Sequence, residues 1–216
     1  MIVDNLKTGD IMLITNSESG IFNYFLNMIK YGTHSDYVHI GMIVKDPDFL
    51  DTPLKGLYLW ESSYEGTPDP QDGIIKLGVQ LTKLSDVFDN YDNAEFYIRR
   101  LKDTTIFTTD KLKEIHNIVY DIPYDIDPMD WFYAFFRKDK HPQKLTRMWC
   151  SSFIGYIFTF LNIIKKDTDW SIMYPCDFAL DGENLNYVDK EKNSLELWEN
   201  KLDISQTILC DFFEIY

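Results

Sequence analysis

The chain has 216 residues, of which 45% are hydrophobic and 16% are aromatic. That share of apolar residues exceeds what a disordered chain carries, and the length suits one domain of ordinary size. The 21 basic and 35 acidic residues leave a formal charge of −14, which repels phosphate backbones and anionic lipid headgroups. We therefore expect one globular domain and no nucleic-acid partner, with the weakly basic stretch 135–144 as a solvated loop or a local exception.

The N-terminus and the cysteines together indicate the cellular compartment in which the protein is expected. Residues 1–10 lack the basic start, apolar run and small-residue cleavage site of a secretory signal, and no apolar run reaches the ~18 residues that span a bilayer. Cys150, Cys176 and Cys210 form no CxxC pair, and an odd number of cysteines argues against a disulfide framework. We expect a cytoplasmic protein without a transmembrane segment. The histidines show no zinc-binding spacing, so no metal is predicted.

Five short segments in the first half of the chain are predicted to be strands. They are rich in apolar, β-branched or aromatic residues, with turn-forming Gly, Asp or Pro residues near several of their ends. The predicted strands are 11–15, 37–44, 56–63, 78–84 and 95–101. Residues 19–32 carry apolar side chains at helical spacing, which indicates either a core-facing helix or an amphipathic membrane helix.

Helices are predicted to dominate the second half. Residues 108–122 open with a Thr/Asp cap signal and end before Pro123, which disfavours helical geometry in the residue that precedes it. Residues 150–164 show the apolar spacing of a buried helix. Further on, a cap and a helix are expected at 174–179 and 194–202, with a final strand at 207–215. Strands followed by helices, without strict alternation, indicate an α+β architecture.

Cys150 falls at the first turn of the predicted helix 150–164. Unpaired backbone N–H groups and the positive end of the helix dipole favour a thiolate there, which is what a nucleophile needs. Free cysteine is also a common core residue, so simple packing is the alternative. A cysteine hydrolase further needs an imidazole to move the thiol proton and a third polar group to orient the ring.

His39 is the best candidate for that imidazole. It lies within the apolar predicted strand 37–44, where a buried ring must find polar partners, either as a satisfied core histidine or as a catalytic group. Gly41 shares its face of the strand and is expected to leave open space beside the ring for a substrate or a helix. His34 lies in a turn-like segment and is expected to be exposed.

Glu61 is the candidate for the orienting group. It alternates in phase with Leu57 and Leu59, so it is predicted to lie on an inward face, where a lone carboxylate is unfavourable unless paired. If its strand neighbours that of His39, the carboxylate can accept the second ring N–H across the strand pair. The alternative is a glutamate at the rim of an edge strand.

Five motifs follow one another along the chain: LKTGDIMLI, HIGMIV, LYLWESS, IPYD with MWCSSFIGYIF, and YPCDFA. In this order they resemble the circularly permuted branch of the NlpC-type, papain-like cysteine peptidases and amidases, which includes YiiX-like proteins and a poxviral group. The resemblance covers residues 7–180. In this branch the histidine strand precedes the cysteine helix, and here His39 precedes Cys150.

For the fold, the resemblance implies one permuted papain-like domain over residues 1–216. A small antiparallel sheet or half-barrel is expected to pack against helices, with residues 181–216 as a C-terminal extension. Tyr124 and Trp149 flank the expected site in sequence, so they are candidates for the wall of a substrate pocket, with a place in the core as the alternative.

For the activity, the resemblance implies Cys150 as nucleophile, His39 as base and acid, and Glu61 as the residue that orients the ring. The expected substrate is a peptide, amide or acyl compound, cleaved at an amide or ester bond without any cofactor. Two alternatives stay open. One is an acyltransferase or lipid hydrolase of the same fold, and the other is a non-catalytic binding or virion-associated module.

Overall fold

The computed structural model describes residues 1–15, 35–91, 93–126 and 145–204. Several predicted features lie outside these described residues: the helix at 19–32, His34, the basic stretch at 135–144, and the final strand at 207–215 with Cys210. Among the described residues, no helix combines the length and the apolarity needed to cross a bilayer.

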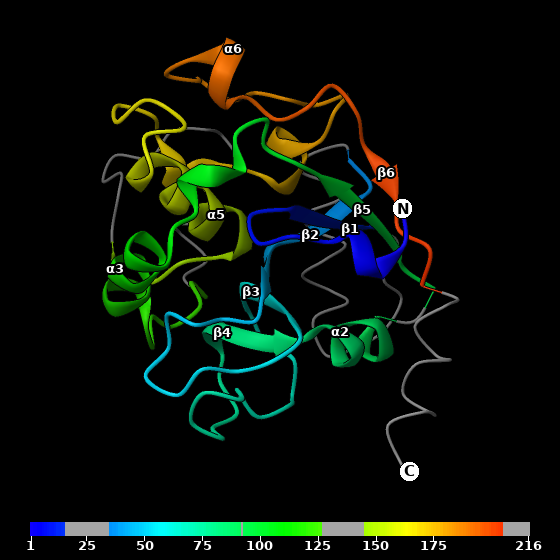
Figure 1. The fold of residues 1–216 in the computed structure, drawn as a ribbon, viewed down its shortest axis with the longest axis vertical. Coiled ribbons are helices and arrows are strands. Elements are labelled where there is room, and N and C mark those ends of the chain that lie inside the picture. The colour runs from blue at the N-terminus through cyan, green and yellow to red at the C-terminus, as the bar shows by residue number, and fades with distance from the viewer. Residues whose placement is uncertain (16–34, 92, 127–144, 205–216) are drawn as a thin grey trace.

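The strands form one sheet in the order β4-β3-β2-β1-β5-β6, and every neighbouring pair is antiparallel. They are β1 (Ile11–Thr15), β2 (Tyr37–Lys45), β3 (Leu57–Ser63), β4 (Gly78–Lys83), β5 (Glu95–Arg99) and β6 (Asn200–Lys201). The five strands predicted in the first half of the chain are thus confirmed. The sheet is open, with β4 and β6 at its edges, and the coarse α+β prediction is confirmed with it (Figure 1).

Three helices pack around this sheet: α2 (Leu84–Asn90), α3 (Thr109–Val119) and α5 (Cys150–Phe160). The last two confirm the predicted helices, and α3 begins where the Thr108 side chain accepts a hydrogen bond from the backbone N–H of Lys111. The sequence did not predict α2. Its seven residues bury only Leu84 and Val87, too few for an apolar spacing to be recognised.

Both faces of the sheet are buried, because successive side chains of a strand point into two different cores. In β1, Ile11 and Leu13 belong to the larger core, whereas Met12 and Ile14 belong to the smaller one. The larger core contains the buried faces of α3 and α5, and the smaller core contains that of α2. Figure 1 shows α3 and α5 to the left of β1 and β2, and α2 to the right of β4. Two-sided burial explains why these strands are nearly continuous apolar runs.

The C-terminal part joins the same sheet. The prediction of a helix at 194–202 is wrong, because this segment runs along β5. The backbone N–H of Glu196 donates to the backbone oxygen of Arg100, and that of Leu202 donates to the backbone oxygen of Phe96. These ladder bonds outweigh the helical preference of the segment. The remaining short elements are η1 (Val3–Asn5), η2 (Thr104–Ile106), η3 (Trp170–Ile172), η4 (Pro175–Phe178) and α6 (Lys190–Asn193).

Candidate active site

Cys150 is the first residue of α5 and is 3% exposed. The preceding residue, Trp149, has extended backbone angles and serves as the N-cap, so the chain enters the helix at the cysteine. The first backbone bond that closes a helical turn runs from Phe153 N–H to Trp149 O, 3.0 Å apart. The N–H groups of the helix before Phe153 therefore have no partner within the helix.

His39 brings an imidazole to this sulfur from β2. His39 is 5% exposed, and the Cys150 side chain is close enough to shift the pKa of its ring. Burial by itself disfavours a charged ring, yet the hydrogen bonds and charges of Cys150 and Glu61 outweigh it and raise the pKa of His39 well above its ordinary value. The structure thus joins a residue of α5 to a residue of the sheet that lies far from it in sequence.

Glu61 meets the other side of the imidazole. Its strand, β3, pairs with β2 through Met42 and Trp60, and its Oε2 lies 2.5 Å from His39 Nε2. Glu61 is fully buried, and a second contact holds its other oxygen: the Thr82 hydroxyl on β4 donates to Oε1 at 2.6 Å. Both carboxylate oxygens are therefore occupied by hydrogen-bond donors.

The hydrogen bond to Glu61 decides which ring nitrogen faces the sulfur. Because Nε2 is used by Glu61, Nδ1 of His39 is the nitrogen left for Cys150. A carboxylate on one nitrogen fixes the tautomer and the plane of the ring, and the other nitrogen can then accept a proton from a thiol and return it later. Chemically, this arrangement is suited to nucleophilic catalysis by sulfur.

The start of α5 is tied directly to the sheet. The Ser62 hydroxyl on β3, next to Glu61, donates to the backbone oxygen of Met148 at 2.6 Å. The Met148 N–H in turn donates to Pro123 O at 3.0 Å. These two bonds hold the residues just before Cys150 against β3, so the thiol and the carboxylate that orients the imidazole share one rigid support.

Tyr124 and Trp149 both lie at this site. Tyr124 is 8% exposed, and burial together with the neighbouring charge of Cys150 raises the pKa of its hydroxyl well above the ordinary value. Trp149 is partly buried, and its backbone oxygen accepts a hydrogen bond from Ser152 at 2.9 Å. Their places beside Cys150 agree with either expected role, as part of a pocket wall or as part of the core.

The open space expected beside Gly41 is not there, and this expectation is corrected. A Cβ atom added to Gly41 would lie 2.6 Å from Cγ of Leu59 on the adjacent strand. The Leu59 side chain therefore occupies the space that a side chain at position 41 would need. Gly41 permits the close packing of β2 against β3 and leaves no room there for a substrate.

Sequence reasoning missed three residues of the site: Thr82, Glu65 and Tyr91. Thr82 was detectable, since Gln80 and Thr82 form a polar pair on one face of an otherwise apolar strand. Glu65 follows the end of β3 and Tyr91 follows the end of α2, and neither position carries a periodic signal. Their relation to His39 depends on how those two ends meet.

One group of possible ligand atoms for a metal ion occurs among the described residues, and it coincides with this site. Atoms of His39, Glu61 and Glu65 lie within 4.8 Å of one another. Two of these atoms, Nε2 of His39 and Oε2 of Glu61, are already joined by a hydrogen bond. A cation between these two residues would have to replace that bond. We assign no metal ion to this group.

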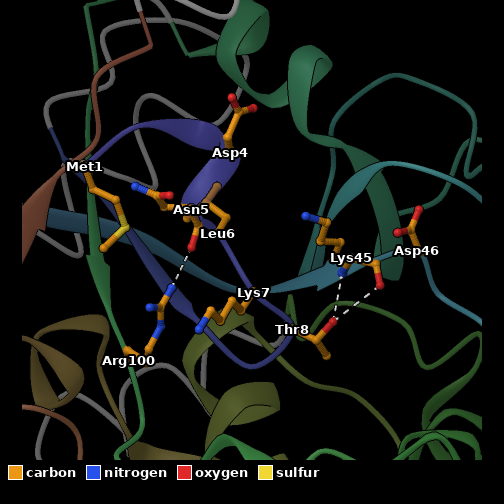
Figure 2. A pocket seen from close by; sticks show the side chains of 9 residues that line it. All are labelled: Met1, Asp4, Asn5, Leu6, Lys7, Thr8, Lys45, Asp46 and Arg100. Carbon is orange, nitrogen blue, oxygen red and sulfur yellow. Dashed lines mark hydrogen bonds between the residues drawn. The ribbon is translucent and has the colours of Figure 1, made fainter.

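Two cavities are lined by other parts of the molecule. One, of about 610 Å³, lies beside the N-terminus and is drawn in Figure 2; there Arg100 donates to Asn5 O, and the hydroxyl of Thr8 accepts from the Lys45 N–H. The second, of about 600 Å³, has a polar and acidic lining that includes Tyr37 and Glu199. Neither cavity is lined by Cys150, His39 or Glu61.

No protein-family model matches the chain, and no curated protein matches it either.

Proposed function

We propose that this protein is a cysteine hydrolase that cleaves amide or ester bonds through a triad of Cys150, His39 and Glu61. One observation carries the proposal: the imidazole of His39 is hydrogen-bonded to the buried carboxylate of Glu61 and lies close enough to Cys150 for that residue to raise its pKa. A buried histidine and a buried glutamate are costly unless they are paired. A cysteine at a helix start, beside an imidazole that a carboxylate orients, is the arrangement that a thiol nucleophile requires.

In the proposed reaction, His39 accepts the proton of Cys150 and the sulfur attacks the carbonyl carbon of the substrate. The imidazolium then gives its proton to the leaving amine or alcohol as the carbon–heteroatom bond breaks, which leaves an acyl-enzyme. His39 next takes a proton from water, which attacks the thioester and releases the acid and the free thiol. Glu61 stabilises the imidazolium at each stage without taking its proton.

The start of α5 supplies the stabilisation of the oxyanion. Backbone N–H groups at a helix N-terminus point outward along the axis and carry partial positive charge. In the proposed mechanism the N–H groups of Cys150 and of the next residues of α5 donate to the negative oxygen of the tetrahedral intermediate. No cofactor enters the proposed mechanism.

We extend the proposal to the fold, as a permuted papain-like domain of the NlpC type. Three features support this: an antiparallel sheet, a cysteine at the first position of a helix that packs on it, and a histidine strand earlier in the chain than that helix. The chain order is the feature that distinguishes the permuted branch from ordinary papain-like enzymes.

The test is to measure how fast iodoacetamide alkylates each cysteine, with sites assigned by peptide mass spectrometry. We expect rapid labelling of Cys150, which His39→Ala slows by at least tenfold at neutral pH. Cys176→Ala is the matched control, because Cys176 is the other cysteine that the structure describes and is more exposed than Cys150. Equal labelling of Cys150 and Cys176, or no effect of His39→Ala, contradicts the triad.

Turnover separates the hydrolase from its alternatives. With p-nitrophenyl acetate we expect a burst of one p-nitrophenol per protein, then steady release that Cys150→Ala abolishes. A burst without steady release, relieved by an added amine or alcohol, indicates an acyltransferase instead. Absence of any burst, with Cys150 still reactive toward iodoacetamide, indicates a binding module.

A further inference from the structure

A second carboxyl group, that of Glu65, lies beside the site. Glu65 is two residues beyond the end of β3 and is partly buried. The Tyr91 hydroxyl donates to its Oε1 at 3.1 Å, and Asn90 Nδ2 donates to its Oε2 at 3.1 Å. The same Asn90 nitrogen also lies 3.1 Å from the backbone oxygen of Glu65. Glu65 thus fastens the end of α2 to the end of β3.

Tyr91 carries this attachment to the imidazole. Its ring is stacked on that of His39, with centroids 5.9 Å apart and planes 17° apart. A nearly parallel aromatic neighbour limits the rotation of the imidazole, whose edge is held by Glu61 through a hydrogen bond. His39 is therefore fixed on its face by Tyr91 and on its edge by Glu61.

Charge adds a second link between Glu65 and His39. The titratable groups that face Glu65 are Glu61 on β3, His39 on β2 and Tyr91 at the end of α2, with Cys150 on α5 just beyond the imidazole. Burial and the charge of Glu61 raise the pKa of Glu65 to about 7, while His39, Asn90 and Ser63 act in the opposite direction. An ionised Glu65 favours a protonated His39, since opposite charges stabilise each other.

We propose that Glu65 is a positioning residue of this site: it holds Tyr91 against the face of His39, and its negative charge stabilises the imidazolium form of that ring. This inference deepens the proposed function and rests on it. Glu65 is proposed to act through Tyr91 and through the electric field at His39, and not by contact with the reacting sulfur.

The experiment follows the His39 imidazole by NMR across pH, in the full-length protein. The variants are Glu65→Gln, which keeps the shape and removes the charge, Glu65→Ala, which also removes the attachment, and Tyr91→Phe, which keeps the ring and removes its hydroxyl. Glu191→Gln is the matched control, because it deletes the same charge at an exposed position on α6. His116 on α3 serves as an internal reference, and His39→Ala assigns the resonance.

We expect Glu65→Gln to move the His39 titration to lower pH, while Glu191→Gln leaves it unchanged and His116 does not respond to either variant. Glu65→Ala is expected to slow the alkylation of Cys150 about tenfold at neutral pH, as the loss of a hydrogen bond to a charged group predicts. Tyr91→Phe is expected to slow it less, because the ring stays in place.

An unchanged His39 titration in Glu65→Gln overturns the electrostatic role, and an unchanged alkylation rate in Glu65→Ala overturns the positioning role. If Glu65→Ala does not fold, Tyr91→Leu replaces it, since it removes the ring from His39 while leaving Glu65. Failure of the proposed function gives a different result. In that case His39→Ala leaves Cys150 labelling unchanged, whatever the NMR titration of His39 shows.

Discussion

The Thr82 hydroxyl lies 2.6 Å from Oε1 of Glu61, on the side of the carboxylate that faces away from His39. The two residues come from neighbouring strands, β3 and β4, which pair Glu61 with Gln80 and Leu59 with Thr82. Thr82 therefore completes a chain of contacts that starts at Cys150 and ends inside the sheet. The orientation of the imidazole depends on a residue that is three contacts away from the sulfur.

Removing this hydroxyl tests the chain directly. In Thr82→Val the shape of the side chain is kept, but Glu61 loses a donor, so we expect kcat for ester hydrolysis to fall about tenfold, as for a lost hydrogen bond to a charged group. Thr109→Val is the control, because the Thr109 hydroxyl also lies 3.0 Å from a carboxylate, that of Asp48, at an exposed site. Equal effects of the two variants would contradict a role for Thr82.

Gly41 offers a second test, which concerns packing. In Gly41→Ala the new methyl group meets Leu59 at 2.6 Å, so we expect a loss of about 1–3 kcal/mol in the free energy of unfolding. Leu59→Ala opens that space, and the double variant should therefore lose less stability than the sum of the single variants, by at least about 1 kcal/mol. Urea denaturation of the three variants measures this coupling, and strictly additive losses would rule out the contact.

Glu65 makes the stability of the protein depend on pH. Its pKa is raised to about 7 in the folded state, so the folded protein holds a proton that the unfolded chain releases at lower pH. Its contribution is present below about pH 4.5 and is lost as the pH rises to about 7, by up to about 3 kcal/mol. Urea denaturation at pH 5 and pH 7.5 should thus show Glu65→Gln gaining stability relative to the wild type as the pH rises. A constant difference between the two proteins excludes this titration.

Asp10 is predicted to stabilise the start of the sheet. It is fully buried and accepts hydrogen bonds from Lys7 N at 2.8 Å and from Arg100 Nε and Nη2 at 2.6 and 2.7 Å. We expect Asp10→Asn to lower the free energy of unfolding by about 2–3 kcal/mol, because a guanidinium then loses its buried partner. Asp51→Asn breaks the exposed pair with Lys113 and should change stability by less than about 0.5 kcal/mol. Similar losses in both variants would contradict the assignment to burial.

Five of the six strands of the sheet were predictable from local sequence, whereas the edge strand β6 was not. β1 to β5 are apolar runs between turn residues, and such runs form strands in almost any sheet that buries them. The prediction of a helix at 194–202 failed because Leu202 bonds to Phe96 in β5 and Glu196 bonds to Arg100 just beyond it, and nothing in the segment itself encodes those neighbours. The short helix α2 escaped prediction because it buries only two residues.

For the candidate site, the sequence alone singled out three groups: the thiol of Cys150, the imidazole of His39 and the carboxylate of Glu61. Cys150 begins an apolar helix, whereas His39 and Glu61 are polar residues at inward positions of apolar strands. A polar side chain at such a position needs a hydrogen-bond partner, so the sequence around each residue is enough to mark it as a candidate. Tertiary structure decided which partners they have. Glu61 is 22 residues from His39, and Glu65 is 26 residues from Tyr91, and both pairs depend on the order of the strands and on where α2 ends. Local sequence sets the periodicity of side chains along an element, but distance between elements follows from their register and packing, which only the folded chain possesses.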